Sequence, residues 1–76
     1  MKARVEFTAT AERHASAFGI LPLAADFTLP GKLVRGDIVE FATPLGTQFF
    51  QVESRRLRIG ADGRQVLVLR LDHPVR

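Results

Sequence analysis

Cysteine, tryptophan and tyrosine are absent from this chain of 76 residues. Without cysteine the fold cannot be held by disulfide bonds, and no thiolate is present to bind a metal ion. A chain of this length buries roughly 60% of its unfolded surface, so a single small core must supply most of its stability. We therefore expect one small domain over residues 1–76. Self-association would be a reasonable way for such a domain to gain stability.

Long apolar runs are also missing. No stretch approaches the roughly 20 apolar residues of a membrane-spanning helix, and the N-terminal residues lack the apolar region of a signal peptide. We expect a cytoplasmic protein that does not contact a membrane. A hydrophobic content of 46%, with charges of both signs interspersed, favours a folded globule over disorder. The net charge of +3 permits an anionic partner such as nucleic acid without requiring one.

Motifs for catalysis and cofactor binding are lacking as well. His14 and His73 have no neighbouring residues that would complete a metal site, and Ser16 and Ser54 lack the context of a nucleophile elbow. The six glycines are scattered as turn residues and form no phosphate-binding loop. We therefore expect no enzymatic activity, no cofactor and no metal. In this interpretation His14 is a solvated helix residue, and Asp37 stabilises a turn.

One long β-hairpin is predicted from Thr47 to Asp72. Residues 65–71 are rich in β-forming side chains and contain no glycine or proline. They follow a three-residue loop, Ala61-Asp62-Gly63, in which Gly63 can adopt a positive φ without a Cβ clash. The register set by this loop pairs Leu57 with Leu67 and Ile59 with Gln65.

The first strand of this hairpin changes the phase of its apolar residues. Phe50 and Val52 are even-numbered, whereas Leu57 and Ile59 are odd-numbered, so an uninterrupted strand cannot bury both pairs on one side. One extra residue near Arg55–Arg56, a β-bulge, would restore the phase. The resulting register predicts that Val52 faces Leu71, Ser54 faces Leu69, and Glu53 lies opposite Arg70. The core face would then consist of Phe50, Val52, Leu57, Leu67, Leu69 and Leu71.

The opposite face of the hairpin is the candidate site. It would carry Glu53, Arg58, Val66, Val68 and Arg70, with an arginine of the bulge close by. The planar fork of donors of arginine suits phosphate, and small barrels bind single-stranded nucleic acid by combining such charge with exposed aromatic rings. The candidate contacts for an anion or nucleic acid are Arg55, Arg56, Arg58, Arg70 and Phe49, the last as a stacking ring that points away from Phe50.

Two alternatives to this site remain open. The arginines can form a solvated strand face, partly neutralised by Glu53 and Asp72, that protects the sheet from edge pairing. A basic site can also lie elsewhere, around Lys2, Arg4 and Arg35.

A short helix is predicted from Ala11 to Phe18. Ala11, Ala15 and Phe18 recur at helical spacing, Thr10 can act as the N-cap, and Gly19 is a typical C-terminal stop. The alternative for residues 9–19 is a continuation of the first strand. We expect the helix to pack over Val66 and Val68; otherwise these valines are left for a partner.

Further strands are predicted at residues 4–8, with Val5 and Phe7 directed inward, at residues 26–29, and at residues 38–42, which a turn at Pro44-Leu45-Gly46 follows. The tail from His73 should fray. The expected fold is mainly β (α+β), a small SH3-like or OB-like antiparallel barrel of about five strands with one short N-terminal helix.

The sequence favours a non-catalytic interaction module that binds another protein or itself, in an unknown pathway. The alternative is a small nucleic-acid-binding barrel that uses the arginine-rich strand face. An accessory subunit of an enzyme is the third possibility.

Overall fold

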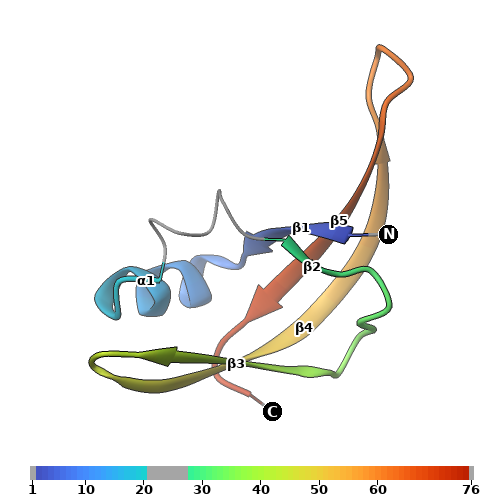
Figure 1. Ribbon diagram of the computed structural model, residues 1–76. Coiled ribbons are helices and arrows are strands. Elements are labelled where there is room, and N and C mark those ends of the chain that lie inside the picture. The colour runs from blue at the N-terminus through green and yellow to red at the C-terminus, as the bar shows by residue number, and fades with distance from the viewer. Residues whose placement is uncertain (1, 21–27, 76) are drawn as a thin grey trace.

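A computed structural model describes residues 2–20 and 28–75 of the chain. Its elements, in order, are β1 (Lys2–Phe7), α1 (Ala9–Ala17), β2 (Thr28–Pro30), β3 (Ile38–Thr43), β4 (Gly46–Ile59) and β5 (Gln65–Asp72). The strands form one sheet in the order β2-β1-β5-β4-β3. Figure 1 shows this sheet curled into a half-barrel, with the β4–β5 hairpin extending beyond the other elements.

The sheet is mixed rather than antiparallel. β1 pairs with β5 in parallel, whereas the other neighbouring strands run antiparallel. The five strands and the short helix confirm the mainly β prediction, but the prediction of a fully antiparallel sheet is wrong. Tight hairpin turns force antiparallel pairing between consecutive strands. β1 and β5 lie at opposite ends of the chain, so no turn sets their relative direction.

The predicted register of the hairpin is confirmed. Leu57 pairs with Leu67 and Ile59 with Gln65. Gly63 has a φ of 81°, the left-handed conformation that the loop requires. Strand β3 and the turn after it also lie where the sequence predicted them, and the carboxylate of Asp37 accepts a hydrogen bond from the backbone N–H of Val34.

The bulge lies at Glu53 and not at Arg55–Arg56. Val52 faces Leu71 as predicted, but the register then shifts, so that Ser54 faces Arg70 and Arg55 faces Leu69. The predicted pairing of Ser54 with Leu69 and of Glu53 with Arg70 is therefore wrong. One extra residue anywhere between Val52 and Leu57 restores the phase equally well, so periodicity alone could not locate it.

The core lies on one face of the sheet, called here the inner face. Its largest fully buried side chains are Phe50, Val52, Leu69 and Leu71. Leu57 points to the same face but is 51% exposed, which corrects its predicted place in the core. It lies on the projecting end of the hairpin, beyond the residues that pack against α1 (Figure 1).

Helix α1 covers this inner face. Ala11 and Ala15 are fully buried in the same cluster as Leu69, and Phe18 packs against it. The strand alternative for residues 9–19 is therefore wrong, and so is the prediction that the helix covers Val66 and Val68. The helix begins directly after β1, and its buried alanines lie on the same face of the sheet as Val5 and Phe7.

The N-cap of α1 is Thr8 rather than the predicted Thr10. The side-chain oxygen of Thr8 accepts the backbone N–H of Ala11 at 3.2 Å and also donates to the Asp72 carboxylate at 2.7 Å. This contact with the end of β5 selects Thr8 over Thr10, which is exposed. Gly19 has a φ of 73°, in agreement with its predicted role after the helix.

His73, directly after β5, lies against the helix. The His73 ring stacks on the His14 ring with a centroid distance of 3.7 Å and an interplanar angle of 11°. Phe50 contacts both rings, and His14 hydrogen bonds to Gln48 at 2.6 Å. His14 is therefore half-buried rather than solvated, because the two flat rings pack on an aromatic cluster. The same packing corrects the prediction that fraying begins at His73, whereas Pro74 and Val75 beyond it are exposed.

The predicted loop strand at residues 26–29 overlaps β2, whose observed bounds are Thr28–Pro30. Asp26 and Phe27 lie outside the described residues.

Candidate interaction surface on the outer face of the sheet

The outer face of the sheet, opposite α1, is ordered in rows by the strand register. Val68 on β5 has Arg56 of β4 on one side and Arg4 of β1 on the other. In the preceding row Val66 pairs with Arg58. In the following row Arg70 lies between Ser54 and Glu6. Valines therefore occupy the middle strand, and arginines occupy the strands on both sides.

These rows enclose a hollow of about 410 Å³, which we call the outer groove. It is lined by Arg4, Val5, Glu6, Arg56, Arg58, Val66 and Val68. Val68 is only 8% exposed and forms the floor together with the half-buried Val66. An apolar floor with charged walls offers both hydrophobic contact and charge recognition to a ligand.

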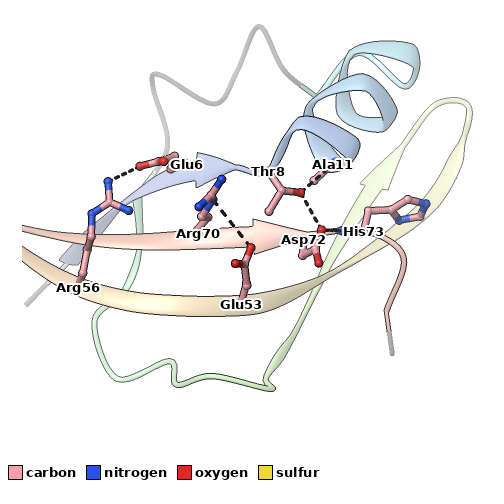
Figure 2. Close-up of polar contacts among 8 residues, drawn as sticks. All are labelled: Glu6, Thr8, Ala11, Glu53, Arg56, Arg70, Asp72 and His73. Atoms are coloured by element: carbon pink, nitrogen blue, oxygen red, sulfur yellow. Dashed lines mark hydrogen bonds and ion pairs between the residues drawn. The ribbon is translucent and has the colours of Figure 1, made fainter.

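Two of the arginines on this face already have acidic partners. Arg56 donates to Glu6 at 2.6 Å, and Arg70 Nε lies 3.8 Å from a carboxylate oxygen of Glu53 (Figure 2). These side chains are 40–47% exposed, so each pair contributes little to stability and can exchange partners.

Arg4 and Arg58 differ from these two. Across residues 2–20 and 28–75, neither side chain has an ion pair or a side-chain hydrogen bond. Both are exposed, and they lie on opposite walls of the outer groove. They are thus the two cations of the outer groove that are most available to a ligand.

The structure divides the predicted site residues. Arg56 and Arg58 line the outer groove, and Arg70 lies in the adjacent row. Arg55 is turned to the inner face by the bulge at Glu53, and its Nε donates to the Gly31 carbonyl at 3.0 Å.

Phe49 lies on the outer face but at the far end of β4. It is 47% exposed and pairs across the sheet with Glu40 of β3. Arg56 lies seven positions further along β4, which corresponds to about 20 Å along an extended strand. The structure therefore does not bring the predicted stacking ring together with the arginines.

Arg4 and Glu6 are the groove residues that the hairpin pattern did not reveal. Their alternation with Val5 and Phe7 predicted that they face away from the core, which is where they lie. The pattern did not indicate which strand lies beside them in the sheet. Only the parallel pairing of β1 with β5 places them beside Val68 and Arg70.

Within the described part of the chain, no group of three or more histidine, cysteine, aspartate or glutamate residues is placed to hold a metal ion. No helix among these residues is long and apolar enough to cross a bilayer. Comparisons of the chain with protein-family models, with curated proteins and with solved structures give no match.

Proposed function

We propose that this protein is a non-catalytic interaction module that binds another protein through the outer groove. The observation that carries the proposal is the position of α1. Because α1 packs on the inner face, it does not cover Val66 and Val68, and arginines stand on both sides of this pair.

The composition of the outer groove supports a protein partner. Protein interfaces combine an apolar centre with a polar rim, and arginine is enriched among the residues that contribute most to binding. The groove has this arrangement, with valines at its centre and both charge signs on its walls.

Nucleic acid is the second candidate, and the observation in its favour is the pair of unpartnered cations Arg4 and Arg58. Two observations weigh against it. Phe49 is remote from these arginines, and Glu6 and Glu53 place negative charge among them. Single-strand binding combines a cationic track with stacking rings, and the groove lining contains no ring.

We include in this proposal that the fold is the SH3-like or OB-like barrel expected from the sequence. It is supported by the curled five-stranded sheet and by the long, bulged strand β4, whose first half pairs with β3 and whose second half pairs with β5. Small barrels of these kinds present a sheet face or its loops to a ligand.

Site-directed photo-crosslinking in the native host tests the proposal. A benzophenone amino acid would replace Val66, and the control would carry it at Arg13, which is exposed on α1. We expect adducts that depend on irradiation at position 66, resist nuclease and are removed by protease.

The other outcomes separate the alternatives. An adduct of twice the protein's own mass would identify self-association. An adduct sensitive to nuclease would favour nucleic acid over protein. Equal labelling at positions 66 and 13 would contradict a binding role for the outer groove.

A further inference from the structure

We infer that the outer groove binds an extended acidic segment of the partner protein, whose carboxylates pair with Arg4 and Arg58 while an aliphatic side chain packs on Val66 and Val68. This inference rests on the proposed function and adds the chemistry of the partner.

The outer groove has the width of one extended polypeptide. Arg4, Val68 and Arg56 lie in one row across three neighbouring strands. With strands about 4.8 Å apart, the two walls are about 10 Å apart at their Cα atoms, which leaves width for one extended polypeptide. The floor runs along β5, so the segment would lie along that strand with alternate side chains directed at the valines.

The outer groove is positively charged. Three arginines and one glutamate line the groove, which gives a net charge of +2. A second copy of the same surface would bring like charges together, so charge complementarity favours an acidic partner over self-association. Arginine side chains are long enough to rise above the valines and to meet carboxylates that point away from the floor.

Glu6 is the acidic residue in the lining of the groove. Its carboxylate already holds Arg56 at 2.6 Å on one wall (Figure 2). A carboxylate of the partner would compete with Glu6 for this guanidinium. Glu6 therefore acts as an internal competitor, and its removal should strengthen the binding of an acidic segment rather than leave it unchanged.

Binding of synthetic peptides tests the inference. The probe is a labelled peptide of alternating glutamate and valine, compared with peptides in which glutamine or lysine replaces glutamate and with single-stranded DNA of equal charge. Fluorescence anisotropy gives the affinities, and thermal unfolding of each variant checks that it remains folded.

We expect only the glutamate peptide to bind clearly among the three peptides, and to bind better than the DNA. Replacing Arg4 and Arg58 together with glutamine should weaken its binding roughly three- to tenfold, since each exposed ion pair contributes modestly. Glu6→Gln should strengthen it about two- to fivefold for the same reason. Arg13→Gln, which removes a charge from the opposite side of the molecule, is the matched control and should change it little.

Three results would overturn the inference. The first is an equal loss of affinity in Arg13→Gln and in the double variant, which would show that the net charge of the protein alone determines peptide binding. The second is binding unaffected by Val66→Ser. The third is tighter binding of the DNA than of the peptide. If crosslinking at position 66 captures a protein while the acidic peptide fails to bind, the inference falls and the proposed function stands.

Discussion

Thr8 connects three elements through one hydroxyl group. It accepts the backbone N–H of Ala11 in the first turn of α1 and donates to Asp72 at the end of β5, as Figure 2 shows. The same carboxylate oxygen of Asp72 accepts the backbone N–H of His73, where the tail turns towards α1. The Thr8–Asp72 pair thus fixes both the start of α1 and the direction in which the chain leaves β5.

Thr8→Val should lower the free energy of unfolding by about 1–2 kcal/mol. Valine keeps the shape of threonine but removes both the cap and the bond to Asp72. Urea denaturation measures the difference. Thr10→Val is the matched control, because Thr10 is exposed on the helix and makes no cap, and it should change stability by less than about 0.5 kcal/mol. Equal effects of the two variants would show that Thr8 does not cap the helix.

At the scale of elements, β4 has two halves with different environments. Its first half carries Phe50 and Val52 into the core, and its second half carries Leu57 and Ile59 on the projecting part of the hairpin, where both are exposed. The bulge at Glu53 keeps all four on the inner face. All four side chains point to the same face, so the burial of each one depends on whether α1 and the neighbouring strands extend far enough to cover it.

Two leucines of the hairpin should respond differently to truncation. Leu69→Ala should cost about 2–5 kcal/mol because Leu69 is fully buried, a large part of the stability of so small a domain. Leu57→Ala should cost less than about 1 kcal/mol, since much of its side chain is already in water. Thermal and urea unfolding of both variants check this difference. A cost for Leu57→Ala as large as that for Leu69→Ala would mean that another chain covers the end of the hairpin in solution.

At the scale of the whole molecule, the hairpin makes the protein elongated. The described fold measures 40 Å along its longest axis and 24 and 21 Å along the others. The core lies at one end of this axis, where α1, β1, β5 and the first half of β4 meet (Figure 1). The far end of the hairpin is stabilised mainly by its own ladder of hydrogen bonds.

Hydrogen exchange should therefore show a gradient along the hairpin. Amides of residues 57–65 should exchange at least about tenfold faster than those of residues 67–71, because local opening at the tip exposes few buried side chains. Exchange measured by NMR at several protein concentrations checks this expectation. Uniform protection at high concentration that is lost on dilution would reveal self-association through the hairpin instead.

Much of the fold was determined by the sequence itself. Gly63, the unbroken run of β-forming residues after it, and the alternation of Arg4, Val5, Glu6 and Phe7 correctly predicted the turn, the register of the hairpin and the faces of β1. These features depend on local backbone geometry and on a period of two, which neighbouring residues specify without help from the rest of the chain.

The tertiary structure decided where the bulge lies, which face α1 covers, and which residues share the outer groove. Arg55 and Arg56 are adjacent, yet one donates to Gly31 on the inner face and the other to Glu6 on the outer face. Arg4 reaches Val68 only through the parallel pairing of β1 with β5. Each of these outcomes depends on contacts between residues far apart in the chain, so no local pattern could specify it.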